Sequence, residues 1–204
     1  KATYAVKVMH RHLKADAANV LRFEREAQLA MSLQHPNIVE VFDFGLTEAS
    51  EPYMVMEYLE GENLDDMLEE SGRLSIEKFA PIFSQVCAGL SYAHESNIVH
   101  RDIKPSNIML VAGTTPPLVK IVDFGIAKAC ASTGEICPTS VAILQSMDWA
   151  AGKPSEEVAA LLQTLTQPGE IFGSPLYMSP EQCNGQEADC RSEVYSLGCM
   201  VFEI

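Results

Sequence analysis

The stretch His100-Arg101-Asp102-Ile103-Lys104-Pro105-Ser106-Asn107 (HRDIKPSN) says more about the fold than any other part of the chain. It places a carboxylate, an ammonium group and an amide in one short loop. A second aspartate, Asp123 of an Asp-Phe-Gly triplet, follows a run of β-forming residues from Leu118 to Val122. Phosphoryl transfer needs this set of groups. One carboxylate accepts a hydroxyl proton, an amide and a second carboxylate hold magnesium, and a lysine neutralises charge near the phosphoryl group.

Further motifs occur in a fixed order on both sides of this loop. They are Tyr4-Ala5-Val6-Lys7, His35-Pro36-Asn37-Ile38-Val39, the stretch from Gly173 to Glu181 (GSPLYMSPE) and the stretch from Asp189 to Gly198 (DCRSEVYSLG). Together with HRDIKPSN and Asp-Phe-Gly, they resemble the protein kinases, specifically the bacterial serine/threonine kinases related to the eukaryotic ones. The resemblance covers almost the whole chain, and its strength lies in the order of the motifs.

The resemblance implies an α+β fold with the two lobes of a protein kinase, truncated at both ends. We expect residues 1–58 to form a partial small lobe and residues 59–204 a partial large lobe. The small lobe would lack its first strands, because no GxGxxG loop occurs in the sequence, and the large lobe would lack its last helices. On this reading the fragment itself binds ATP weakly and is inactive.

Hydrophobic periodicity predicts several elements independently of the resemblance. Alternation around Lys7 fits a strand, and 53–58 reads as a strand that leads into a hinge between the lobes. Apolar residues at helical spacing predict a helix over roughly 17–33 and a long helix over 74–96. We expect Cys87, on the apolar face of the long helix, to be a small buried residue.

The resemblance implies catalytic roles for residues of the central loop. Asp102 would accept or orient the proton of a substrate hydroxyl, and Lys104 stands where the serine/threonine branch has lysine. Asn107 and Asp123 would bind two magnesium ions, since both offer hard oxygen ligands. Ser174 replaces a threonine that usually bonds the catalytic aspartate and lysine, and its hydroxyl keeps that ability. His100 would pack beneath Phe124 without taking part in the chemistry.

The ATP-binding residues also follow from the resemblance. Lys7 would contact the α and β phosphates and pair with a glutamate of the next helix. Glu26 has the expected distance from His35, whereas Glu24 is the alternative. The two lie about 200° apart around a helix, so only one can face the site. Alternatively, Glu26 lies on the helix surface and forms an ion pair with Arg22, four positions earlier.

The hinge and the activation segment complete the expected site. Glu57 and Leu59 would offer backbone groups to adenine, with Met56 as the gatekeeper. Thr166 matches a regulatory threonine whose phosphate would pair with Arg101.

Two features depart from the family pattern. Glu193 stands where the family has an aspartate that holds the catalytic loop, and its extra methylene could be tolerated or could misplace the loop. The activation segment, 123–181, is long because of an insertion at about 135–164. Apolar stripes there predict two short helices within 139–165, with Met147 on the first of them; a marginally helical insertion is the alternative.

Composition limits the other possibilities. A net charge of −14 argues against a nucleic-acid surface. The six cysteines form no CxxC pair, which fits reduced thiols in a cytoplasmic domain. No apolar run within the fragment approaches the roughly 18 residues of a membrane helix. Membrane anchoring of a longer parent stays open.

The leading interpretation is an ATP- and Mg2+-dependent protein serine/threonine kinase. Its partners would be proteins with Ser or Thr acceptors, and a kinase dimer is one arrangement for trans-autophosphorylation. The alternative is a pseudokinase or scaffold module that keeps the fold. The intact set of Lys7, Asp102, Asn107 and Asp123 favours the enzyme.

Overall fold

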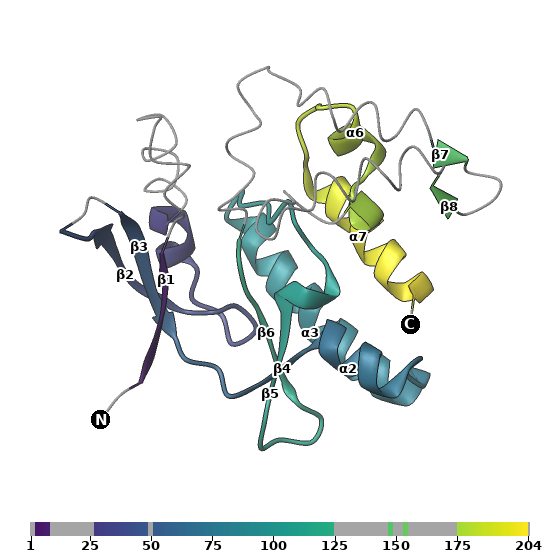
Figure 1. Cartoon of the computed structure of the whole chain (residues 1–204), viewed down its shortest axis with the longest axis horizontal. Coiled ribbons are helices and arrows are strands. Elements are labelled where there is room, and N and C mark those ends of the chain that lie inside the picture. The colour runs from purple at the N-terminus through teal and green to yellow at the C-terminus, as the bar shows by residue number, and fades with distance from the viewer. Residues whose placement is uncertain are drawn as a thin grey trace.

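The computed structural model describes residues 3–8, 27–48, 51–124, 147–148, 153–154 and 175–203. Most of these residues form two bodies, one around the strands β1 to β3 and one that contains α2, α3 and α7 (Figure 1). The strands are β1 (Tyr4–Val8), β2 (Val41–Leu46), β3 (Pro52–Glu57), β4 (Gly61–Asn63), β5 (Ile108–Val111), β6 (Leu118–Ile121), β7 (Met147–Asp148) and β8 (Lys153–Pro154). The helices are α2 (Leu64–Ser71), α3 (Ile76–Glu95), η2 (Pro105–Asn107), η4 (Pro175–Tyr177), α6 (Pro180–Cys183) and α7 (Cys190–Glu203).

The first body is an antiparallel sheet in the order β1-β3-β2. Residues 27–32 are helical, and their small side chains Ala27 and Ala30 pack against Val41 and Met54 of the sheet. The predicted strand around Lys7 and the predicted hinge strand are confirmed, the latter shifted by one residue. The predicted helix is confirmed over 27–32; its earlier part lies outside the described residues.

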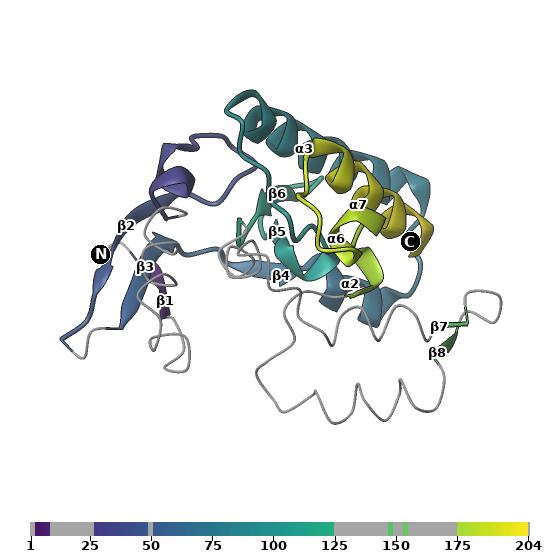
Figure 2. The same ribbon diagram turned by 90° about the horizontal axis from the view of Figure 1, so that it is seen from above.

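The second body contains the antiparallel sheet β4-β5-β6 and the helices α2, α3 and α7 (Figure 2). Helix α3 begins after Ser75 and ends before Ser96, close to the predicted bounds. The predicted stripe is buried at Phe79, Ile82, Val86, Leu90 and Ala93, whereas its sixth member, Phe83, is half-buried. Cys87, on the same helix, is only half-buried. No helix among the described residues is both long and apolar enough to span a membrane.

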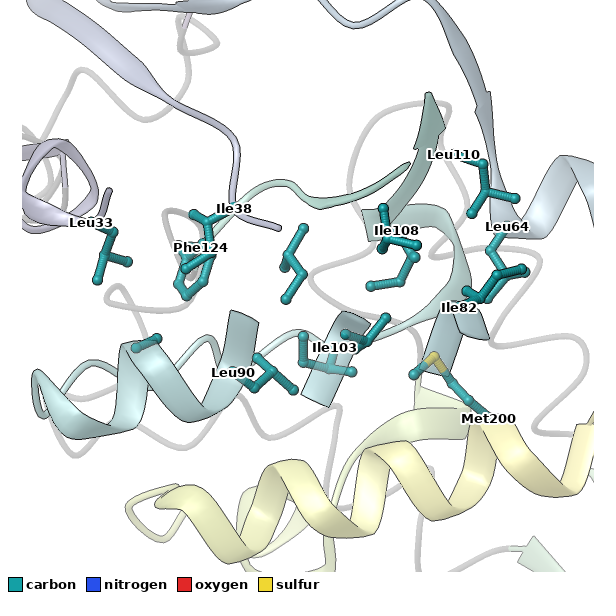
Figure 3. Close-up of a cluster of buried hydrophobic side chains, with 14 of the residues drawn as sticks. Leu33, Ile38, Leu64, Ile82, Leu90, Ile103, Ile108, Leu110, Phe124 and Met200 are labelled. Carbon is teal, nitrogen blue, oxygen red and sulfur yellow. The ribbon is translucent and has the colours of Figure 1, made fainter. Parts of the chain in front are cut away.

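The main hydrophobic core lies between these elements (Figure 3). Ile82 and Leu90 of α3, Ile108 of β5 and Met200 of α7 all belong to it. Ile38 extends the core toward the first body, because it pairs with Ile121 in a parallel bridge. The Val39 amide donates to the Ile121 carbonyl at 2.9 Å, and the Ile121 amide donates to the Asn37 carbonyl at 2.9 Å. The two bodies are therefore joined at the strand that leads to Asp123.

Part of the insertion differs from the prediction. Met147 and Asp148 form the short strand β7, which pairs with β8 in an antiparallel ladder. The expectation that Met147 continues a helical stripe is therefore wrong. Cross-strand pairing takes precedence there over local apolar spacing, which is a weak signal in short segments. The rest of the expected helical pair lies outside the described residues.

Two helical glycines give a test of the packing. A Cβ at position 89 in α3 would lie 2.8 Å from Ile121 Cδ1 and 3.1 Å from the Asn37 carbonyl oxygen. We expect Gly89→Ala to lower the free energy of unfolding by about 1–3 kcal/mol, because Ile121 must move. A Cβ at position 198 in α7 would have no described atom within 4 Å apart from its chain neighbours and the backbone of its own helix. Gly198→Ala is the control, with a gain of roughly 0.5–1 kcal/mol expected from helix propensity. Denaturant unfolding measures both, and equal effects would contradict this account.

Candidate active site

The HRDIKPSN loop brings three of the expected catalytic residues together. Asp102 Oδ2 lies 3.2 Å from Lys104 Nζ and accepts a hydrogen bond from Asn107 Nδ2, also at 3.2 Å. The same Asn107 nitrogen donates to the Asp102 carbonyl at 2.7 Å. Asn107 ends the 3-10 turn η2 and is buried, so the loop closes on itself around this amide. The ammonium of Lys104 is thus close to the carboxylate expected to handle the hydroxyl proton.

The buried side chain of His100 packs under the HRDIKPSN loop and bonds to its backbone. The imidazole is fully buried, its ring centroid lies 4.6 Å from that of Phe124, and its Nδ1 accepts the Asp102 amide at 3.2 Å. Since Nδ1 is the acceptor, Nε2 carries the proton and donates to the Val122 carbonyl at 2.8 Å. Burial lowers the pKa of His100, which keeps the ring neutral. The expected packing of His100 beneath Phe124 is confirmed.

Glu193 of α7 does reach the catalytic loop. Its carboxylate is buried, and Oε1 accepts the Arg101 amide at 2.8 Å. The second oxygen, Oε2, lies 2.5 Å from His94 Nε2 on α3. The extra methylene of glutamate is therefore accommodated, and both carboxylate oxygens have partners.

Lys7 and Asp123 meet across the two bodies. Lys7 Nζ lies 2.6 Å from Asp123 Oδ1, and the two side chains are 42% and 40% exposed. Asp123 has φ of +60°, a left-handed backbone region that few residues other than Gly, Asn and Asp adopt. Asn107 lies close to Asp123 in space, because the Asn107 carbonyl accepts a hydrogen bond from the amide of Val122, the residue before Asp123, at 3.0 Å. The structure thus places Lys7, Asp123, Asn107 and Asp102 in one region.

The hinge carries a charged contact that the sequence did not indicate. Glu57 Oε1 lies 2.5 Å from Lys120 Nζ on β6 and accepts the Glu40 amide at 2.8 Å. The Glu57 amide itself donates to the Glu40 carbonyl at 2.9 Å. Leu59 lies in the segment between β3 and β4 and is half-buried. Met56 lines a small cavity next to the site, with Val41, Met54 and Phe124 among its neighbours.

Sequence reasoning missed Lys120 and His94. Their partners lie 63 and 99 positions away along the chain, and a strand lysine or a helical histidine has no local signature of such a contact. The expected residues Glu26 and Ser174, and the alternative Glu24, lie outside the described residues, as does Thr166. Among the described residues, no group of three or more His, Cys, Asp and Glu is arranged to hold a metal ion.

Comparisons with known proteins agree with this geometry. The family model described as protein kinase domain matches residues 1–204. The chain is 38% identical over 203 residues to the serine/threonine-protein kinase PknB of Mycolicibacterium smegmatis, covering 98% of this chain and 28% of that protein. It is 37% identical over 203 residues to PknB of Mycobacterium tuberculosis, with the same coverage. It is also 36% identical over 200 residues to the kinase pkn3 of Myxococcus xanthus, covering 98% of this chain and 32% of that protein. The chain thus spans about a third or less of these relatives.

Solved structures share the fold. A crystal structure of the Mycobacterium tuberculosis PknI kinase domain superposes with a TM-score of 0.65 at 24% identity. The match covers 98% of this chain and 61% of that one.

Removal of the buried Glu193 carboxylate should be costly. We expect Glu193→Ala to lower the free energy of unfolding by about 2–3 kcal/mol, because the Arg101 amide and His94 both lose a partner in a buried site. Glu193→Gln keeps an oxygen for the Arg101 amide and should cost less. Denaturant unfolding of both variants is the measurement. Equal stability of Glu193→Ala and the wild type would show that the carboxylate does not support the loop.

The buried neutral His100 should make stability depend on pH. Its folded pKa lies below the unfolded value of about 6.5, so the unfolded chain takes up a proton first as pH falls. We therefore expect the free energy of unfolding to drop between about pH 7.5 and pH 5.5, by up to about 1.4 kcal/mol per unit below the unfolded pKa. In His100→Phe this slope should shrink but persist in part, because burial and Lys120 also lower the pKa of His35. An unchanged slope in the variant would contradict the assignment.

Proposed function

This chain belongs to the protein kinase domain family, and we propose that the intact protein transfers the γ-phosphoryl group of ATP to Ser or Thr hydroxyls of protein substrates. One observation carries the proposal: Lys7 and Asp123, from separate parts of the sequence, lie in the same region as Asp102, Lys104 and Asn107 of the HRDIKPSN loop. The relatives named above as serine/threonine-protein kinases support the choice of acceptor.

Asp102 is the residue we assign to the substrate hydroxyl. A carboxylate is a weak base in water, so its contribution is to orient the hydroxyl and accept its proton as the new bond forms. Asn107 and Lys104 both contact its Oδ2, which restricts the rotation of the carboxylate. Lys104 also supplies positive charge where negative charge gathers on the transferring group.

The residues present suit a Mg2+–ATP complex. Asn107 turns its amide nitrogen toward Asp102, which leaves the amide oxygen as the atom that can ligate a cation. Asp123 offers a carboxylate, and these two oxygens match the preference of magnesium for hard ligands with phosphates and water in the remaining positions. When bound, magnesium neutralises charge on the phosphates and orients them for transfer.

Lys7 and the hinge are assigned to ATP. Lys7 would contact the α and β phosphates, and its pairing with Asp123 would be exchanged for contacts with the nucleotide. Glu26 remains the proposed partner of Lys7 in the nucleotide-bound form. The Glu57 carbonyl and the Leu59 backbone are the groups proposed for adenine, since the Glu57 amide already donates to Glu40. Ser174 is proposed to bond Asp102 and Lys104.

The wider organisation is part of the same proposal. We assign residues 1–58 to a small lobe, 59–204 to a large lobe and 123–181 to the activation segment with its insertion at about 135–164. By family resemblance, the partners are Ser/Thr-containing proteins, trans-autophosphorylation would use a kinase dimer, and the kinase domain is cytoplasmic.

A pseudokinase is the less favoured alternative. The sequence features that favour it are Glu193 and the long insertion, and Glu193 accepts a hydrogen bond from the Arg101 amide at 2.8 Å. Pseudokinases typically lose at least one residue of the catalytic set, and this chain has all four of them: Lys7, Asp102, Asn107 and Asp123.

Removal of the Asp102 carboxylate tests the proposal. We expect Asp102→Asn in the intact protein to lower kcat for phosphorylation of a Ser/Thr peptide on the order of 10³-fold or more, because the hydroxyl loses its proton acceptor. Transfer of radiolabelled phosphate from ATP measures this, with Glu70→Gln on the exposed side of α2 as a control. Turnover that survives in Asp102→Asn, or a wild-type protein that binds ATP without transferring phosphate, would exclude the assignment.

A further inference from the structure

The peptide unit that enters Asp102 lies outside every described helix and strand. Its two polar groups, the Arg101 carbonyl and the Asp102 amide, therefore need partners other than those of a regular helix or strand. The Asp102 amide donates to His100 Nδ1 at 3.2 Å. Arg101 has φ of +68°, which is unfavourable for a residue with a side chain and persists only where surrounding contacts impose it. The partner of the Arg101 carbonyl thus matters for the geometry of Asp102.

That partner is Gln182 of helix α6. Gln182 Nε2 donates to the Arg101 carbonyl oxygen at 2.8 Å, across 81 positions of sequence. The other end of the same amide, Oε1, accepts the Ser179 amide at 3.1 Å in a capping box that starts α6. A glutamate fills this place in a capping box equally well, because the box needs only an acceptor. The donor end of Gln182 is therefore not required by α6.

We propose that Gln182 is a positioning residue for Asp102, acting through the Arg101 carbonyl. Gln182 and His100 hold the two sides of one peptide plane, and a rotation of that plane would redirect the Cα–Cβ bond of Asp102. Because α6 follows the turn Pro175–Tyr177, the contact also links that part of the chain to the catalytic loop. This inference rests on the proposed kinase function and adds a residue to its machinery.

Two substitutions test the donor, and only Gln182→Glu removes it without also removing the capping acceptor. Gln182→Glu keeps the capping acceptor but places an oxygen opposite the Arg101 carbonyl, and Gln182→Met removes both polar ends without adding charge. In the intact protein, we expect each to lower kcat about tenfold, which is the scale of one lost hydrogen bond at a site that must be held in place. The KM for ATP should stay within about twofold, because Gln182 does not contact the residues assigned to the nucleotide.

A pH series separates positioning from general damage. The carboxyl group that Gln182→Glu introduces can again donate to the Arg101 carbonyl once it is protonated. A glutamate carboxyl group titrates at about pH 4.3 in water, and the Arg101 carbonyl oxygen opposite it favours the protonated form and so raises this pKa. We expect the ratio of kcat in this variant to that of the wild type to rise as pH falls from about 7 to about 5, while the ratio for Gln182→Met stays flat. Cys183→Ala is the control on the same helix, since the Cys183 side chain faces the Met178 carbonyl. Its kcat should stay within about twofold of the wild type.

Amide hydrogen exchange of residues 100–107 gives a readout that needs no activity. We expect faster exchange in Gln182→Met and wild-type exchange in Cys183→Ala. Unchanged kcat together with unchanged exchange in Gln182→Met would overturn the inference, and so would an equal loss in Cys183→Ala. If the wild type transferred no phosphate, the proposed function would be wrong. Amide hydrogen exchange of residues 100–107 would still show whether Gln182 holds the loop.

Discussion

The active-site loop depends on one constraint: the peptide groups of Arg101 and Asp102 must be hydrogen-bonded although no helix or strand contains them. The Arg101 amide bonds to Glu193, its carbonyl bonds to Gln182, the Asp102 amide bonds to His100, and its carbonyl bonds to Asn107. These partners come from α7, α6, the loop itself and η2. Arg101 and Asp102 therefore keep their conformation only if α6 and α7, which are distant in sequence, stay in fixed positions relative to the loop.

The second requirement is that Asp123 and Lys7 meet although they belong to different bodies. The parallel bridge between Ile38 and Ile121 connects the segment before β2 to β6, two residues before Asp123. The ion pair between Glu57 and Lys120 joins the same strand to the hinge. Ile38 and Phe124 also pack in the main core, so the hydrophobic effect holds the two bodies together in addition to these polar contacts. The position of Asp123 is thus set by both bodies.

Much of the fold could be predicted from sequence because it follows local patterns. The helical stripe from Phe79 to Leu90 predicts burial on one face, and the structure shows that burial. The alternation around Lys7 predicts the strand correctly but not its burial, since Tyr4, Val6 and Val8 are exposed. Contacts such as Glu57 with Lys120 and Gln182 with Arg101 have no such pattern, since they depend on how distant elements pack. Local spacing failed at Met147 for the same reason, because pairing with β8 is not encoded in the spacing of its neighbours.

The two proposed magnesium ligands, Asn107 and Asp123, flank the same β-hairpin, formed by β5 and β6. Asn107 immediately precedes β5 and Asp123 lies two residues beyond β6, so both stand at the open end of one hairpin whose register pairs Ile108 with Ile121. The closed end, residues 112–117, lies at the opposite end of the strands. Residues can be inserted in or deleted from that turn over evolution without changing the distance between the two ligands. A one-residue slip of the strands would instead turn Val119 and Ile121 out of the core, so selection for folding alone preserves the spacing that the chemistry needs.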